Sequence, residues 1–160
     1  MVTSARHASP DDLICSLSAS AATTSDSFGA SCAMEGGTLV IGSFGFPSRP
    51  VTMAGAAYVF TQPAGDLFQE AAKLVASDPR SNSAFGTSAG ISGNFINVSA
   101  PRAEFGTGFG MTSAAYIFRG TGSAWSQEDK IEPNIATGDS GRFDFPARIV
   151  PSKEGPRHAA

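Results

Sequence analysis

The sequence that decides the fold lies at residues 84–101, which read Ala-Phe-Gly-Thr-Ser-Ala-Gly-Ile-Ser-Gly-Asn-Phe-Ile-Asn-Val-Ser-Ala-Pro. After a polar stretch it continues at residues 114–118 with Ala-Ala-Tyr-Ile-Phe. An earlier part of the chain has the same order of residues, from Phe28-Gly29 to Ala57-Tyr58-Val59-Phe60, and the two copies are 57 to 58 residues apart. This internal repeat predicts two copies of one structural unit stacked against each other.

Few charges and many glycines characterise the composition. Of the 160 residues, 16% are charged and 18 are glycine, which suits short strands joined by tight turns in one ordinary domain. The net charge of −3 and the absence of a Lys/Arg run argue against nucleic acid or an anionic membrane as the main partner. No stretch approaches the roughly 20 apolar residues of a membrane span, and residues 1–12 lack the apolar centre of a signal peptide. We therefore expect a soluble chain without an export signal.

Each copy of the repeat predicts three strands and then a fourth segment. The expected strands are at residues 29–34, 38–43 and 56–60 in the first copy, and at 86–91, 95–100 and 114–118 in the second. Glycine-containing turns at 35–37 and 92–94 separate the first two strands, because glycine supplies the positive φ that tight hairpins need.

The fourth segment gives conflicting signals. Residues 66–76 are rich in helix formers, so local propensity favours a helix. The counterpart at 124–131 is short and alternates, with Trp125, Gln127, Asp129 and Ile131 at the same parity as Phe68, Glu70, Ala72 and Leu74. This shared parity predicts a strand with each set on one face.

The repeat also divides the chain. The predicted parts are a disordered tail (1–12), the last strand of a partial unit with a loop (13–27), two complete units (28–77 and 78–135), the start of a third (136–150), and a second disordered tail (151–160). The third start is Gly141-Arg142-Phe143-Asp144, where Asp144 stands at the position of Gly86.

Three elements of the unit recur in order. The Phe-Gly pair is Phe28-Gly29 and Phe85-Gly86, and an Ala-Tyr-aliphatic-Phe strand stands at 57–60 and 115–118. The Gly-Ala-Pro element is altered in both copies, to Gly42-Ser43-Phe44 and to Ser99-Ala100-Pro101. In these elements the sequence resembles the FG-GAP repeat, which builds the head of integrin α chains and many surface proteins. The resemblance covers roughly residues 13–150. It implies an all-β fold of consecutive four-stranded antiparallel β-propeller blades, and a non-enzymatic role in protein interaction or adhesion at the cell surface or outside the cell.

Two departures from that family pattern matter. Integrin-type repeats carry a calcium loop between their first two strands, but the turns Glu35-Gly36-Gly37 and Ser92-Gly93-Asn94 have too few carboxylates for the six to eight oxygen ligands of calcium. We therefore expect no metal and no cofactor. A propeller also needs about four to eight blades to close, so this chain would form an incomplete arc. A fragment of a longer protein, an incomplete gene model and assembly with further copies are the open explanations.

Catalytic chemistry has one candidate. Gly86-Thr87-Ser88-Ala89-Gly90 matches the Gly-x-Ser-x-Gly elbow of serine hydrolases, which requires a strand-to-helix turn and a histidine close to the serine. No helix is expected after Ser88, and the histidines are His7 and His158, near the two ends of the chain. We interpret Ser88 as part of a strand. Cys15 and Cys32 are too few for a disulfide framework or a four-ligand zinc site, and whether they pair stays open.

Two long loops at equivalent positions, 44–54 and 101–113, are the candidate interaction loops. Their aromatic and charged residues have the composition of protein interfaces: Phe44, Phe46, Arg49, Arg102, Glu104, Phe105 and Phe109. The favoured hypothesis is a non-enzymatic propeller segment that presents these loops for protein interaction or adhesion, with protein ligands or further propeller blades as its partners. A small hydrolase using Ser88 and a self-assembling structural module are the alternatives.

Overall fold

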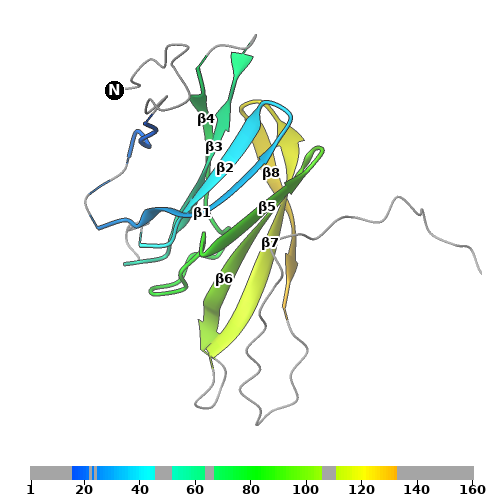
Figure 1. Ribbon diagram of the computed structural model, residues 1–160. Helices are drawn as coiled ribbons and strands as arrows, with labels where there is room; N and C mark the ends of the chain where they lie inside the picture. Colours follow the sequence, from blue (N-terminus) through cyan, green and yellow to red (C-terminus); the bar gives the residue numbers. More distant parts are fainter. Residues whose placement is uncertain are drawn as a thin grey trace, which may run out of the picture.

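The computed structural model describes residues 16–21, 23, 25–45, 52–63, 67–105 and 111–132. Within them, eight strands form two four-stranded antiparallel sheets, each with its strands in chain order (Figure 1). Blade 1 consists of β1 (Phe28–Glu35), β2 (Thr38–Ser43), β3 (Ala56–Thr61) and β4 (Gln69–Leu74). Blade 2 consists of β5 (Ser88–Ser92), β6 (Phe95–Phe105), β7 (Met111–Thr121) and β8 (Ala124–Ile131). The predicted all-β architecture of consecutive blades is confirmed, and the two sheets do not close into a ring.

The fourth segment of each unit is a strand and not a helix, but its predicted parity is wrong. In blade 1 the register passes from Val59–Ala72 to Phe60–Glu70, so Ala71 is an extra residue, and an equivalent irregularity lies opposite Ile117 and Phe118 in blade 2. A β-bulge of this kind shifts the alternation of side chains between faces. As a result Leu74 joins the core between the blades, whereas Phe68 packs on the other face of blade 1.

The predicted loop at 101–113 is mostly strand. After an irregularity between Ala100 and Glu104, the β6–β7 ladder resumes with the pairs Glu104–Thr112 and Phe105–Met111. Pro101 lies at this irregularity, where a residue without a backbone N–H is tolerated. The composition of residues 101–113 predicted a loop. It could not reveal that strand pairing resumes after the irregularity, because that depends on how β6 and β7 meet.

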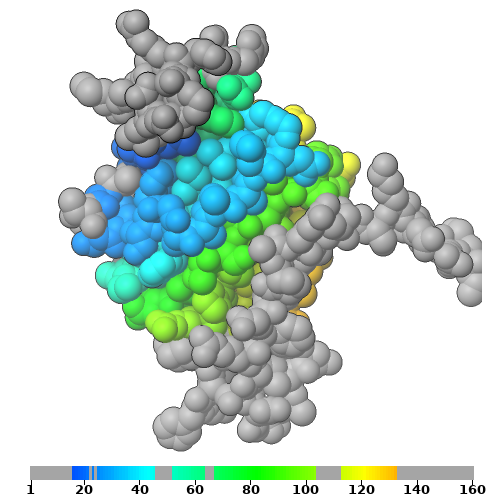
Figure 2. Space-filling view, viewed as in Figure 1, coloured from blue at the N-terminus to red at the C-terminus, as the bar shows by residue number. Residues whose placement is uncertain are grey.

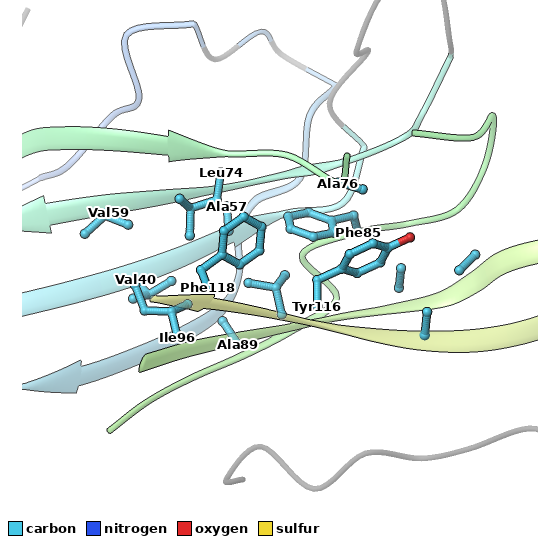
Figure 3. Close-up of a cluster of buried hydrophobic side chains, with 14 residues drawn as sticks. Val40, Ala57, Val59, Leu74, Ala76, Phe85, Ala89, Ile96, Tyr116 and Phe118 are labelled. Atoms are coloured by element: carbon cyan, nitrogen blue, oxygen red, sulfur yellow. The ribbon is translucent and has the colours of Figure 1, made fainter. Parts of the chain in front are cut away.

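Two aromatic clusters, each made of two phenylalanines and a tyrosine, lie on the two faces of blade 1. Between the sheets, the Phe85 ring packs edge-on against Tyr116 and Phe118, with centroids 5.3 and 6.0 Å away (Figure 3). On the opposite face of blade 1, Phe28 packs in the same way against Tyr58 and Phe60, at 5.7 and 6.2 Å. The tyrosine and phenylalanine of each strand are almost fully buried. Figure 2 shows blade 1, in blue and cyan, lying directly against the green atoms of blade 2.

Residues 16–21 repeat contacts that join the two blades, although residues 16–19 form no strand. Leu17 and Ala19 pack against the cluster on the outer face of blade 1, as their counterparts Leu74 and Ala76 do between the blades. The Ser20 amide donates to the Glu70 carboxylate (2.6 Å), and the equivalent Ser77 amide donates to the Gln127 side-chain oxygen (3.0 Å). The predicted tails (1–12 and 151–160), residues 13–15 and the partial third unit (136–150) lie outside the described residues.

Candidate interaction surface

The linker between the blades, residues 75–87, forms hydrogen bonds with the stems of both candidate loops. The Asn82 amide donates to the carbonyl of Thr52 (2.9 Å), and the Phe85 amide and the Ser83 hydroxyl donate to the carbonyl of Ala54 (2.9 Å each). From the other side, the Arg102 amide donates to the carbonyl of Ser83 (3.2 Å). These bonds place the described ends of the two loops along one rim of the blade pair.

The backbone at this rim is held in an unusual conformation. Met53, Asn82 and Ala84 have positive φ values of 54°, 64° and 58°. For Met and Ala this left-handed region costs roughly 1–2 kcal/mol per residue, and such residues cluster where the surrounding structure fixes a functional loop. The hydrogen bonds of residues 82–85 supply that constraint. The backbone at this rim is therefore held in one defined conformation by these hydrogen bonds.

We define the rim patch as Met53, Arg80, Asn82 and Arg102, all of which are exposed. Met53 is 48% exposed, which is high for a large apolar side chain. Arg102 was among the predicted interaction residues, but the other three members of the rim patch were not, because nothing in the local sequence marks Met53 as left-handed. The turn-forming residues Pro79, Ser81 and Asn82 were the available signal.

The other predicted interaction residues have different surroundings. Phe44 is half-buried and directly follows β2. Glu104 and Phe105 belong to β6, where they pair with Thr112 and Met111. Phe46, Arg49 and Phe109 lie outside the described residues.

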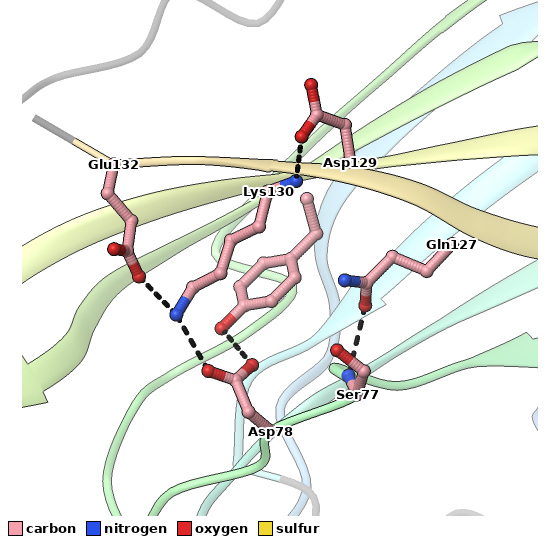
Figure 4. Close-up of polar contacts among 7 residues, drawn as sticks. Ser77, Asp78, Gln127, Asp129, Lys130 and Glu132 are labelled. Carbon is pink, nitrogen blue, oxygen red and sulfur yellow. Dashed lines mark hydrogen bonds and ion pairs between the residues drawn. The ribbon is translucent and has the colours of Figure 1, made fainter.

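A polar cluster anchors the same linker to blade 2 (Figure 4). The carboxylate of Asp78 accepts hydrogen bonds from the Tyr116 hydroxyl (2.9 Å) and from Lys130 Nζ (2.7 Å), and Lys130 also pairs with Glu132. Burial alone would raise the pKa of Asp78, but the bonds from Lys130 and Tyr116 hold that pKa below its ordinary value. Burial and the bond to Asp78 raise the pKa of Tyr116. The cluster therefore fixes the linker to blade 2 at Asp78, two residues before Arg80 of the rim patch.

Ser88 does not occupy a nucleophile elbow. It lies in β5 opposite Ser99, its amide donates to the Ser99 hydroxyl (3.0 Å), and β5 continues through a tight turn into β6. His7 and His158 lie outside the described residues. The local geometry is that of an ordinary strand, without the sharp strand-to-helix turn that the reaction requires.

The described part of the chain contains no group of three or more His, Cys, Asp or Glu residues able to hold a metal ion. At the tip of blade 1 the Glu35 carboxylate accepts a bond from the Gly93 amide (3.2 Å), which joins the two equivalent hairpin turns. Cys32 is an exposed, free thiol on β1, and Cys15 lies outside the described residues. Over those same ranges, no helix has the length and apolar character to cross a membrane.

The comparisons with known proteins agree with this architecture. The family model of the FG-GAP repeat matches residues 14–60 and 68–118. No curated protein matches the chain. Each matched segment ends in the tyrosine-containing strand of one blade, at Phe60 in β3 and at Phe118 in β7. The chain therefore belongs to the FG-GAP repeat family and contains two of its repeats.

Proposed function

We propose that this chain is a non-enzymatic interaction module that binds a protein partner through the rim patch. FG-GAP repeats suggest a protein-interaction module of the β-propeller type. The observation that carries the proposal for this chain is the convergence of both loop stems on residues 82–85. Methionine and arginine are enriched at protein interfaces, and arginine often contributes a large share of the binding energy.

The proposal includes a role in adhesion as part of a longer surface or secreted protein. FG-GAP repeats typically occur in extracellular proteins, and this support comes from the family. The module needs no metal or cofactor for this role, since its hairpin turns offer too few carboxylates for calcium. The two arginines of the rim patch favour a partner with exposed carboxylates.

The test uses the full chain in cross-linking mass spectrometry with extracellular medium or cell-surface extract. Two rim variants, Arg102→Glu and Met53→Asp, are compared with the wild type and with Met34→Asp. Met34 is a matched control because it is 68% exposed but lies near the tip of the β1–β2 hairpin. Aspartate at position 53 tolerates the left-handed backbone.

We expect the wild type and Met34→Asp to cross-link the same protein, and the rim variants to lose most of that product. Equal cross-linking by the rim variants and the wild type would contradict the proposal. If the only product is a dimer of the chain itself, the self-assembling module is the better description. Pairing through sheet edges has one feature against it, because the edge strand β8 carries Glu128, Asp129 and Lys130.

A further inference from the structure

The contact between the blades depends on three glycines. A Cβ atom on Gly42 would lie 1.9 Å from the carbonyl oxygen of Gly86, and one on Gly55 would lie 1.9 Å from that of Phe85. A Cβ atom on Gly86 would lie 2.3 Å from the carbonyl oxygen of Ala56. All three obstacles are backbone atoms, so no side-chain rotation can relieve them. The Phe85-Gly86 segment docks on blade 1 only because these positions lack side chains.

The registers of the two sheets identify the equivalent positions on blade 2. Gly42 pairs with Ala57 in blade 1, and Ser99 pairs with Ala115 in blade 2. Gly55 directly precedes Ala56, which pairs with Ser43. The matching pair in blade 2 is Ala100–Ala114, and Ser113 directly precedes Ala114. Blade 2 therefore carries serine at both positions where blade 1 must have glycine.

Both serines are built into blade 2. The Ser99 hydroxyl accepts the bond from the Ser88 amide (3.0 Å). Ser113 is buried within β7, in a ladder that continues to the pair Phe105–Met111. In blade 1 the β2–β3 ladder ends at Ser43–Ala56, which leaves Gly55 available for its parallel bridge with Phe85. In the sequence, the residue at the position of Gly86 in the third unit start is Asp144.

From this replacement we infer that blade 2 ends the propeller arc on its side. A further FG-GAP unit cannot dock on the outward face of blade 2 in the way that blade 2 docks on blade 1. The Cβ atoms of Ser99 and Ser113 would clash with the backbone of its Phe-Gly segment, as Cβ atoms on Gly42 and Gly55 would clash with Phe85-Gly86. The opposite end of the arc differs, since Ser20 and Glu70 on the outer face of blade 1 repeat the Ser77–Gln127 contact. The arc accepts a neighbouring unit on one side only. This inference is independent of the rim patch.

The test is an extended chain in which a second copy of residues 76–132 is inserted directly after Glu132. This spacing repeats that of the native blades, and the inserted copy brings its own Phe-Gly segment with glycine in place of Asp144. The extended chain is compared with a version in which the first-copy residues Ser99 and Ser113 are both changed to glycine. The readout is amide hydrogen exchange at the inserted copy of Phe85, whose native amide bonds to Ala54.

With serine at both positions, we expect the inserted amide to exchange as in an exposed loop while native Phe85 stays protected. With glycine at both positions, we expect the inserted amide to exchange at least about tenfold more slowly. Equal protection of the inserted and native amides in the serine version would overturn the inference. Absence of protection in the glycine version would show that the two serines are not the obstacle. Protection of native Phe85 reports in every case that the original blades are folded.

Discussion

Substitution of Gly42 by alanine is expected to destabilise the chain strongly. The added methyl group would lie 1.9 Å from the Gly86 carbonyl oxygen and 2.3 Å from the Ser31 hydroxyl, and normal contact requires a separation near 3.4 Å. The linker must therefore move away from β2 by more than an ångström, which also breaks the 3.0 Å hydrogen bond from Ser31 to Gly86. Overpacking costs about 1–3 kcal/mol and a lost hydrogen bond about 0.5–1.5 kcal/mol. We expect the free energy of unfolding to fall by about 2–4 kcal/mol.

Urea denaturation followed by tryptophan fluorescence measures this change, since Trp125 packs against the cluster between the blades. Gly37→Ala is the matched control, because a Cβ there would meet the carbonyl oxygen and the Cβ of Gln62 at ordinary distances of 3.5 and 3.8 Å. The free energy of unfolding of the control is expected to lie within about 1 kcal/mol of that of the wild type, since alanine also lowers the entropy of the unfolded chain. A Gly42→Ala variant as stable as the control would refute the close packing of the linker against β2.

Three further predictions concern charge and metal. Because the folded-state pKa of Asp78 is lowered, the stability that this carboxylate contributes is present above about pH 4 and is lost as the pH falls through the folded value. In Asp78→Asn the midpoint of urea denaturation should therefore fall less than in the wild type as the pH is lowered through this range. Parallel curves of the urea midpoint against pH for the two chains would contradict this prediction. Burial, followed by the charges of Glu70 and Asp26, raises the pKa of Tyr58 to about 12, and the pKa of Tyr116, the other tyrosine of the chain, is raised as well. Alkaline absorbance titration should therefore show no tyrosinate near pH 10 until the fold opens, and stability should decline as the pH rises above that value. Excess calcium or a chelator should leave the Tm unchanged, whereas a shift that grows with calcium concentration would indicate a bound ion.

The strand order of each blade could be predicted because the repeat supplied two independent readings of every element. Residues 66–76 show its value, since composition alone favours a helix and the alternation around Trp125 corrected it. The same alternation could not reveal the bulges, which depend on how β4 and β8 pair with β3 and β7. Bulges carry no fixed residue signature when, as here, Ala71 and Glu128 occupy the equivalent positions.

The candidate surface was predictable only in part. Arg102 could be named as a candidate from the sequence, but the extension of β6 and β7, which places Arg102 in a strand, could not be predicted because it depends on pairing beyond Pro101. The left-handed backbone at Met53 and Ala84 is fixed by hydrogen bonds between segments about 30 residues apart, and local sequence does not encode it. The requirement for glycine at positions 42 and 55 could not be predicted from local sequence either, because it comes from contact with the Phe85-Gly86 segment of the neighbouring blade.

The two blades share a lysine that lies over a tyrosine ring, but they take the nearby carboxylate from different parts of the chain. In each blade a lysine lies over the ring of the equivalent tyrosine, Lys73 at 5.9 Å from Tyr58 and Lys130 at 5.6 Å from Tyr116. Blade 1 supplies a carboxylate nearby from Glu70 on β4, whereas the equivalent residue of blade 2 is the neutral Gln127. In blade 2 one carboxylate comes from Asp78 in the linker, at the position of Ala21 in the preceding segment, and a second comes from Glu132, which also pairs with Lys130. Placing the acid in the linker ties residues 77–80 to blade 2 with two charge-assisted bonds, whereas Glu70 holds its segment through Ser20. The junction with the charged linker is the one that also positions Arg80, Asn82 and the rest of the rim patch.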